Sequence, residues 1–584
     1  MSRSSQLFDR EELWSVVKEI VLRRRREFRR FKFFEDVWRG LEETNFVIVE
    51  APPGSGKTEA LHAPFLAGLK RCERNWLSLI HVLPMRSLVE NMFVRGCKEL
   101  EYLNIKGVVP TVDHGLSIIE PFLEGDLVFT TYDTLFYTMY GYRVRGYHVL
   151  MPLGKIIKSI MVLDEVQLLQ DSYWYPLSVL PSHIGFLLEL GSTVVIASAT
   201  LPQFLHELLI DEARRRRVEV KCIISEERPP RGSLEISLEK ASILHVVNEE
   251  NLRGVEKPLL IVVNTVERAV TVYWKLRKLG YKPMLLHGRL KRIVRKERET
   301  IFEKRQDPDI IISTQVIEAG VDYDFRTVIT EVAPIDSIIQ RLGRCARFKD
   351  RNGRAYICSC TEKTAREATK HVYPFIIIER SLENLNEVYL KESLEDVRVA
   401  HGLVSDVYTK DVIQRLQSND VRKMISSIAK FANWMSTSKG IWRLRDSKEV
   451  IRSLLRISQE VHCLVLTNDE YDKLIKSVKE SGLNKVKIDW LKPNEIKDSS
   501  FSFSIRGRDY DFLKHEIDGK ETYLALEFEG GGEGEGEAYV NCFTDFNNIA
   551  GELKYRSNLF LVVNPKFYEY DDGYDVGVVR VRGA

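Results

Sequence analysis

Short apolar runs alternate with stretches of helical periodicity over much of this 584-residue chain. The runs are apolar at nearly every position, which is typical of strands buried on both faces of a parallel sheet. Segments with apolar residues at helical spacing separate them. This alternation predicts an α/β domain with strands at 46–50, 77–83, 127–131, 160–163 and 193–198, and with helices at 58–70, 86–103 and 132–140.

The alternation starts again further along the chain and predicts a second parallel sheet with strands at 259–263, 283–286, 310–313, 328–331 and 355–358. After about residue 370 the pattern becomes helix-rich, and from about 501 it becomes rich in strands. We therefore expect five segments: a basic helical segment at 1–45, α/β domains at 46–228 and 229–370, a helical region at 371–500 and a β-rich domain at 501–584.

A loop rich in glycine and proline follows the first strand. It reads Ala-Pro-Pro-Gly-Ser-Gly-Lys-Thr over residues 51–58. In such a loop, backbone N–H groups and a helix N-terminus converge on an anion, and glycines let a phosphate approach the backbone. We predict an ATP site in which Lys57 contacts the β- and γ-phosphates and Thr58 binds Mg²⁺, and in which the loop contributes Pro53, Gly54, Ser55 and Gly56.

Two adjacent carboxylates follow the apolar strand at 160–163. We expect Asp164 to hold Mg²⁺ and Glu165 to polarise the attacking water. An apolar run that ends in Asp-Glu is common by itself. Its position between the phosphate loop and the segment Ser198-Ala199-Thr200 favours a nucleotide hydrolase.

The second α/β domain has no phosphate loop, but it contains Gln340 and arginines at 341, 344 and 347. Their spacing places the arginines near one face of a predicted helix. An arginine from a neighbouring domain accelerates phosphoryl transfer by ~10³–10⁵, because it stabilises charge in the transition state. Arg344 and Arg347 are the candidates, and a solvated basic helix face is the alternative.

Composition adds little, because the formal net charge is only +2. Any basic track for nucleic acid must come from local arrangement. The N-terminal segment combines arginines at 23–26 with phenylalanines at 28, 31, 33 and 34, which suits either nucleic-acid contact or packing on the next domain. Eight scattered cysteines and the lack of any ~20-residue apolar run predict a cytoplasmic protein with no membrane partner.

The order of these motifs resembles that of superfamily 2 helicases over about residues 40–365. Within that class, three features are similar to the helicase subunit of type I CRISPR interference. They are Val112-Asp113-His114-Gly115, the sequence STQVIEAGVD at 313–322 followed by QRLGRCAR at 340–347, and the ending NPKFYEY at 564–570 with YDVG at 574–577.

The resemblance implies two tandem RecA-like domains and assigns further roles. Gly320, Asp322 and Gln340 would sense the nucleotide, and Ser198 and Thr200 would couple hydrolysis to movement. The nucleic-acid backbone would contact Arg86, Thr130, Thr131, Asn264, Thr265, His287, Gly288, Arg289, Ser313 and Thr314.

The resemblance also implies a function. The chain would use ATP to move 3′ to 5′ on single-stranded DNA and to unwind the target that a guide-RNA surveillance complex opens in antiviral defence. Two rival readings are another superfamily 2 motor, acting in DNA repair or on RNA, and a nucleic-acid-binding scaffold with an inactive ATPase site.

Two departures from the family pattern carry information. Position 167 is Gln where the family usually has His, which leaves the coupling of hydrolysis to DNA movement open. The family often carries an HD nuclease with adjacent His-Asp metal ligands, but none of the twelve histidines here is followed by Asp. We therefore expect a separate HD nuclease subunit, as in split archaeal systems.

Overall fold

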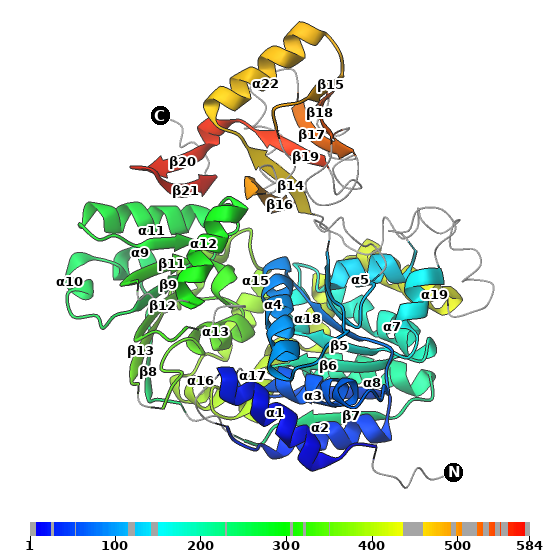
Figure 1. The fold of residues 1–584 in the computed structure, drawn as a ribbon. Coiled ribbons are helices and arrows are strands. Elements are labelled where there is room, and N and C mark those ends of the chain that lie inside the picture. The colour runs from blue at the N-terminus through cyan, green and yellow to red at the C-terminus, as the bar shows by residue number, and fades with distance from the viewer. Residues whose placement is uncertain are drawn as a thin grey trace. The chain divides into compact units, whose positions relative to one another are not determined.

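Seven parallel strands form the first sheet among the described residues of the computed structural model (Figure 1). Their order is β3-β4-β2-β5-β6-β1-β7. The bounds are Phe46–Glu50 (β1), Leu79–Leu83 (β2), Pro110–Asp113 (β3), Leu127–Thr131 (β4), Ile160–Asp164 (β5), Thr193–Ser198 (β6) and Val220–Ile224 (β7). Every residue of β1, β2, β4, β5 and β6 is buried, as the apolar runs predict.

The structure describes residues 7–24, 28–52, 54–114, 123–141, 150–227, 231–303, 308–318, 323–349, 351–435, 460–491, 498–504, 523–529, 537–543, 549 and 559–578. The chain forms two compact units, Met1–Pro230 with Glu383–Ile457 and Arg231–Leu382 with Ser458–Ala584. The first unit therefore contains two segments that are distant in the sequence.

Helices of the first unit surround this sheet. They are α1 (Arg10–Arg24), α2 (Lys32–Glu43), α3 (Lys57–Lys70), α4 (Arg86–Tyr102), α5 (Tyr132–Met139), α6 (Leu150–Ile156), η1 (Val166–Leu169), α7 (Tyr175–Glu189), α8 (Gln203–Arg215), α16 (Glu387–Ser393), α17 (Val397–Val407), α18 (Lys410–Leu416) and α19 (Asn419–Met435).

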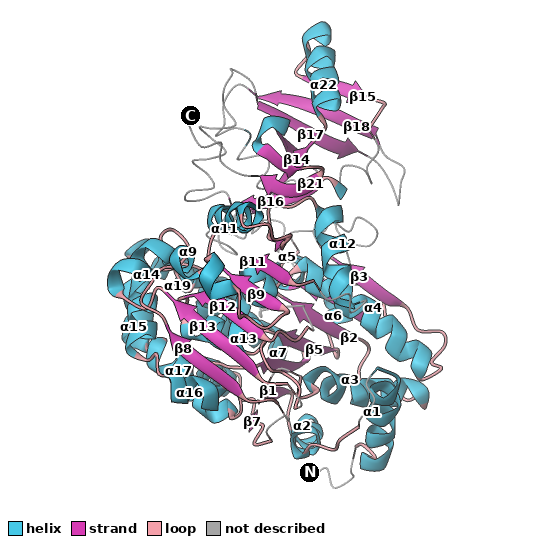
Figure 2. Cartoon of the chain, turned by 90° about the vertical axis from the view of Figure 1, so that its left-hand side faces the viewer, coloured by secondary structure: helices cyan, strands magenta, loops and turns pink. Residues whose placement is uncertain are grey.

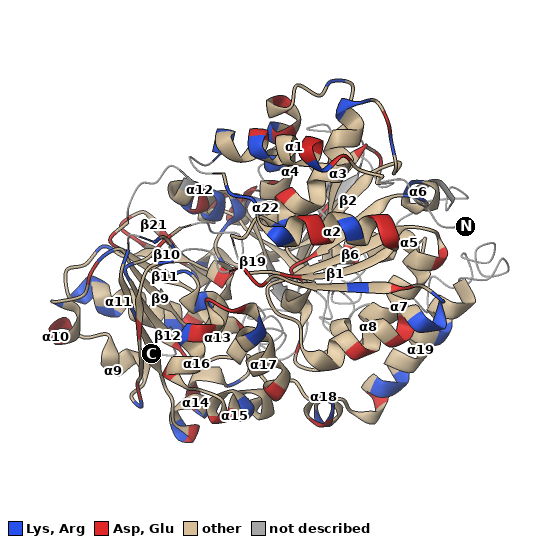
Figure 3. Cartoon of the chain, turned by 90° about the horizontal axis from the view of Figure 1, so that it is seen from below, with Lys and Arg blue, Asp and Glu red and all other residues tan. Residues whose placement is uncertain are grey.

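The N-terminal helices belong to the core of the first unit. Phe33 and Phe34 are 2% exposed and share one hydrophobic cluster with Trp14, Trp38 and residues of α3. Basic and acidic residues lie side by side on the outer faces of α1 and α2 (Figure 3). These described phenylalanines therefore take the packing role, which is the second of the two readings of this segment.

The second unit contains a parallel sheet in the order β10-β11-β9-β12-β13-β8 (Figure 2). Its elements are β8 (Leu234–Leu238), α9 (Ile243–Val246), α10 (Glu249–Leu252), β9 (Leu259–Val262), α11 (Val266–Lys278), β10 (Met284–Leu286), α12 (Arg292–Glu303), β11 (Ile310–Ser313), η2 (Gln315–Glu318), β12 (Thr327–Glu331), α13 (Ile335–Leu342), β13 (Gly353–Cys358), α14 (Glu362–Thr369) and α15 (Phe375–Glu383). The predicted fold class, two α/β domains with parallel sheets, is confirmed.

The described C-terminal strands form a third, mixed sheet and a hairpin. The elements are β14 (Glu460–Val465), α22 (Asn468–Ser481), β15 (Lys485–Ile488), β16 (Ser500–Ser504), β17 (Tyr523–Glu529), β18 (Glu537–Phe543), β19 (Leu559–Val563), η4 (Pro565–Phe567), β20 (Tyr568–Asp571) and β21 (Tyr574–Val578). The region 371–500 is not helical throughout, because β14 pairs with β16 and β19, and β15 pairs with β18.

Strands β3 and β7 are the two edge strands of the first sheet, and β8 is an edge strand of the second sheet. The hydrophobic pattern of the sequence does not predict these three strands. Their residues are partly exposed, so they lack the continuous apolar run that marks the central strands.

Candidate functional site

The phosphate loop connects β1 to α3. Gly54 and Gly56 have φ values of 83° and 94°, a backbone region that favours glycine. A Cβ on Gly56 would lie 2.9 Å from Cζ of Phe34, so the loop also needs glycine for space. Lys57 Nζ donates to the Ala51 carbonyl at 2.7 Å, and the buried Ser55 hydroxyl makes no hydrogen bond within the described residues. The geometry of the loop fits the binding of an anion such as a phosphate. Pro53 lies outside the described residues.

The acidic pair lies beside this loop. Parallel strands β5, β6 and β1 are neighbours, so Asp164, Ser198 and the phosphate loop meet at one sheet edge. Asp164 accepts a hydrogen bond from the Glu165 amide at 3.0 Å. Burial raises the pKa of Asp164, but the hydrogen bond from His81 and the charge of Lys57 outweigh it, so the pKa falls below its usual value. Asp164 is thus held as a carboxylate, the form that binds Mg²⁺.

Gln167 joins the acidic pair to the Ser198-Ala199-Thr200 segment. Its amide nitrogen donates to the Glu165 carboxylate, and its amide oxygen accepts from the Ser198 hydroxyl at 2.5 Å. The Ser198 Oγ also accepts from the Thr200 amide at 3.1 Å. The Gln167 side chain thus makes two hydrogen bonds at a position where the family usually has His. The backbone of Glu165 is left-handed, with a φ of 53°.

Two buried histidines, His81 and His62, form a series of side-chain contacts that starts at the Asp164 carboxylate. Asp164 Oδ2 lies 3.3 Å from His81 Nε2, and His81 Nδ1 lies 2.8 Å from His62 Nε2. His62 Nδ1 then lies 2.8 Å from Glu99 Oε2 on α4. Both rings are fully buried. The chain of contacts therefore connects the candidate Mg²⁺ ligand to the helix that begins at Arg86.

All four imidazole nitrogens take part in these contacts. Burial lowers the pKa of His81. At the far end, Arg95 Nε donates to Glu99 Oε1 at 2.9 Å. Sequence reasoning missed His62 and His81, since each looks like an ordinary polar residue in an apolar segment.

We expect His81→Ala to raise the half-saturating Mg²⁺ concentration of ATP hydrolysis by about 10–100-fold, because partners behind metal ligands set ligand orientation and basicity. ATPase rates across a Mg²⁺ titration measure the effect. His183→Ala is the matched control, because His183 is equally buried but bonds Tyr140. Equal Mg²⁺ dependence in the two variants would refute the supporting role.

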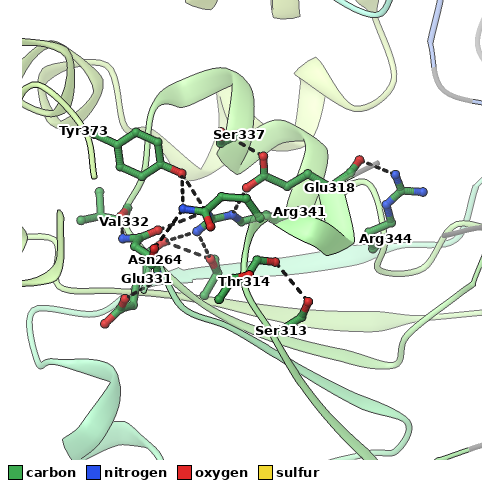
Figure 4. Close-up of polar contacts among 12 residues, drawn as sticks. Asn264, Ser313, Thr314, Glu318, Glu331, Val332, Ser337, Arg341, Arg344 and Tyr373 are labelled. Carbon is green, nitrogen blue, oxygen red and sulfur yellow. Dashed lines mark hydrogen bonds and ion pairs between the residues drawn. The ribbon is translucent and has the colours of Figure 1, made fainter. Parts of the chain in front are cut away.

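Arg341 organises a buried polar network in the second unit (Figure 4). Its guanidinium is fully buried, pairs with Glu318 at 2.7 Å and donates to Thr330 Oγ1 at 3.0 Å. It also donates to Asn264 Oδ1 at 3.1 Å and to the Tyr373 hydroxyl at 3.3 Å. Arg341 therefore stabilises the packing around α13.

The predicted helix through all three arginines is wrong, because α13 ends at Leu342. Arg344 and Arg347 lie in the following turn, where Phe325 donates to the Arg344 carbonyl at 2.9 Å and accepts from the Ala346 amide. This local pairing with Phe325 replaces the helical hydrogen bonds. Arg344 donates to the Glu318 carbonyl at 2.5 Å, and the Arg347 amide donates to Asp324.

The other residues expected to sense nucleotide divide into two groups. Gly320 and Asp322 lie outside the described residues. Gln340 is described, and both polar atoms of its amide are buried without a hydrogen bond inside the described part of the chain. A buried amide without hydrogen bonds costs free energy, so the position of Gln340 fits a residue that hydrogen-bonds to a ligand.

Two of the expected nucleic-acid contacts are buried and hydrogen-bonded within the second unit. Asn264 is 2% exposed, and its amide donates to the carbonyls of Val332 and Ala368. His287 is fully buried, and its Nε2 lies 2.8 Å from the Val576 carbonyl. Burial lowers the pKa of His287 to about 3. Both side chains bond within the second unit, and their contact with nucleic acid stays a prediction.

The remaining candidates differ in exposure. Arg86, Thr265, Gly288 and Arg289 are partly exposed. Arg86 begins α4, and Thr265 caps α11 through the Arg268 amide. The side chains of Thr130, Thr131, Ser313 and Thr314 are buried. Their contact with nucleic acid stays a prediction.

His287 is covered by the β20–β21 hairpin, which contains the C-terminal sequence singled out above. Tyr273 donates to Asp571 at 2.7 Å, Trp274 to Glu569 at 2.9 Å and Arg298 to the Asp575 carbonyl at 2.7 Å. A Cβ on Gly577 would lie 2.5 Å from the His287 ring. The hairpin therefore packs directly on the second parallel sheet domain and fixes the His287-Gly288-Arg289 loop.

These features define a class. Two parallel sheets, with a phosphate loop after β1 and an Asp-Glu pair at the end of β5, which are separated only by β6, form the arrangement of RecA-like domains that superfamily 2 helicases share. Residues 35–208 match the DEAD/DEAH box helicase family, and residues 256–350 match the family "CRISPR-associated nuclease/helicase Cas3, C-terminal".

Individual relatives carry the same name. The chain is 27% identical over 436 residues to the CRISPR-associated helicase Cas3 of Thermoproteus tenax, which covers 71% of this chain and 73% of that protein. It is 26% identical to the CRISPR-associated nuclease/helicase Cas3 of Methanothermobacter thermautotrophicus, over 66% of this chain and 49% of that protein. The predicted resemblance to the CRISPR-associated helicases is confirmed.

Solved structures show the same fold. T. fusca Cas3 aligns with a TM-score of 0.55 and 18% identity, covering 77% of this chain and 60% of that one. A chain of a "CRISPR RNA-guided surveillance complex, pre-nicking" aligns with a TM-score of 0.55 and 15% identity over 94% of this chain and 70% of that one. The chain thus spans between about half and three quarters of these relatives. Among its described helices, none combines the length and apolarity that a membrane crossing needs.

Proposed function

We propose that this chain is an ATP-driven motor that moves 3′ to 5′ on single-stranded DNA and unwinds the target opened by a guide-RNA surveillance complex. The observation that carries the proposal is the joined site of the first unit. There, the phosphate loop, Asp164-Glu165 and Ser198 lie at the ends of the three consecutive strands β1, β5 and β6 of the sheet, and Gln167 links Glu165 to Ser198. The sequence similarity to Cas3 helicases supports the choice of partner.

Each residue has a distinct task in this proposal. Lys57 would release the Ala51 carbonyl and bind the β- and γ-phosphates of ATP. Thr58 and Asp164 would hold Mg²⁺, which neutralises phosphate charge when bound. Glu165 would orient the attacking water, and Arg344 and Arg347 remain the candidates for stabilising transition-state charge.

The Gln167 bridge supplies a route for coupling. A change at Glu165 on hydrolysis would be transmitted through Gln167 to Ser198, and through the Thr200 amide to the loop after β6. The histidine chain would carry the state of Asp164 to α4, which begins at the candidate DNA contact Arg86. DNA backbone contacts give affinity without sequence preference and weaken with salt.

We further propose that DNA cleavage belongs to a separate HD nuclease subunit. The support is that no histidine of the chain is followed by Asp. Purified protein with Mg²⁺, Mn²⁺ or Co²⁺ should leave single-stranded DNA intact. Cutting that persists through further purification and co-elutes with the protein would contradict the proposal.

The motor is tested by ATPase assays with single-stranded DNA and with RNA of the same sequence, followed by unwinding of duplexes with 3′ or 5′ overhangs. We expect stimulation by DNA and unwinding only from the 3′ overhang. Stimulation by RNA alone would favour an RNA helicase, and no turnover with either would favour an inactive scaffold. Recruitment to a DNA-bound guide-RNA complex separates the proposal from a DNA-repair motor.

A further inference from the structure

Two histidines and a glutamate converge next to the phosphate loop without taking part in the proposed reaction. Glu50 is the last residue of β1, His206 lies on α8, and His401 lies on α17. One side-chain donor atom from each lies within 4.8 Å of the others. Glu50 is fully buried, His206 is 5% exposed and the His401 side chain is 18% exposed.

Both imidazoles face the Glu50 carboxylate. His206 Nε2 lies 2.6 Å from Glu50 Oε1, and His401 Nδ1 lies 3.3 Å from each of the two carboxylate oxygens. Ligand atoms around a tetrahedral Zn²⁺ lie about 3.3 Å apart, because each bond is ~2.0–2.1 Å. The His401 contact is long for a charge-assisted hydrogen bond but matches this separation. The His206 contact would need to open by about 0.7 Å.

The surroundings orient the donors. The Leu201 amide donates to Glu50 Oε2 at 2.8 Å, which fixes the orientation of the carboxylate. Cys222 is a hydrogen-bonding neighbour of His206. Backbone and side-chain partners of this kind fix metal ligands in place. Partial exposure of His401 leaves a route for an ion, and a water molecule would supply the fourth ligand.

We propose that Glu50, His206 and His401 bind a divalent transition-metal ion of the Zn²⁺ type. Two imidazoles and one carboxylate form a donor set suited to such an ion rather than to Mg²⁺ or Ca²⁺, which prefer oxygen ligands. The ion connects Glu50 to His206, which is 156 residues further along the sequence, and to His401, which is 351 residues further along. It fastens α17 to the strand that leads into the phosphate loop.

The proposal is tested by metal binding to the full chain, purified without an affinity tag and dialysed against chelator. We expect about one equivalent of Zn²⁺ per chain, a Co²⁺ complex with visible absorption, and a higher thermal unfolding temperature with Zn²⁺ present. His401→Gln should lose the equivalent of metal and the Zn²⁺-dependent shift. The matched control His245→Gln changes an exposed histidine of the second unit and should behave as wild type.

Glutamine still donates a hydrogen bond to Glu50, so His401→Gln separates metal binding from a simple hydrogen-bonded cluster. If the wild type binds no Zn²⁺ or Co²⁺, or if His401→Gln binds as much as wild type, the metal site is refuted. His206→Gln repeats the test at the more buried ligand. These readouts do not depend on ATP hydrolysis, so they stand or fall separately from the motor function.

Discussion

Lys57→Ala is expected to abolish DNA-stimulated ATP hydrolysis, with a loss in turnover of at least about 10²–10³-fold. Lys57 is only 8% exposed, and its ammonium group already lies 2.7 Å from the Ala51 carbonyl of the loop. No other described lysine side chain bonds to this loop. A phosphate-release assay at saturating single-stranded DNA measures the effect.

The control for Lys57→Ala is Lys70→Ala at the other end of the same helix. Lys70 is exposed and pairs with Glu19, so its loss should leave turnover unchanged.

Glu165→Gln should reproduce the loss of hydrolysis while ATP binding is retained, because the amide keeps the size of the side chain but not its charge. Wild-type turnover in either Lys57→Ala or Glu165→Gln would show that the site is assigned wrongly.

Arg341→Ala is expected to destabilise the second unit by ~3–5 kcal/mol, because removing one partner leaves a buried charge uncompensated. Arg341 is fully buried, and its loss would leave the Glu318 carboxylate, which is only 6% exposed, without the positive charge that Arg341 supplies. Asn264 and Tyr373 also lose a donor. Urea unfolding followed by circular dichroism measures the change in unfolding free energy. Arg354→Ala, an exposed arginine on β13, should cost less than ~1 kcal/mol.

Arg344→Ala should behave differently from Arg341→Ala. Arg344 lies beyond the end of α13 and is partly exposed, so its loss should change stability less than the loss of the fully buried Arg341. Its proposed role predicts a fall in turnover of up to ~10³–10⁵-fold with a small change in ATP affinity. Equal losses in turnover and affinity would reduce Arg344 to a binding residue, and Arg341-like destabilisation would make it structural.

The central strands and the motifs at their ends were predictable because their signals are local. Strand β1 has the predicted bounds, since five consecutive apolar or buried positions precede a Pro/Gly loop. Gly54 and Gly56 show the left-handed φ values that the loop chemistry demands. The pair Asp164-Glu165 follows its strand directly, so its position at the sheet edge follows from the strand assignment.

Burial and pairing across long sequence separations were not predictable. The three-residue spacing of the arginines suggested one helical face, but a bridge to Phe325 ends the helix at Leu342. His287 looked like a loop residue, yet a hairpin 289 residues later covers it. From the sequence, glutamine at 167 leaves the coupling of hydrolysis to DNA movement open, whereas in the structure its amide joins Glu165 to Ser198.

By itself, the sequence determined the α/β class, the phosphate loop and the acidic pair, because each depends on neighbours within a few residues. The tertiary structure decided which polar residues are free to act and which hold the fold together. Arg341 and Asn264 pack against each other, His62 and His81 support Asp164, and His401 meets Glu50. Those roles depend on which segments fold against one another, and the residues next to a position in the sequence do not determine which distant segment will contact it.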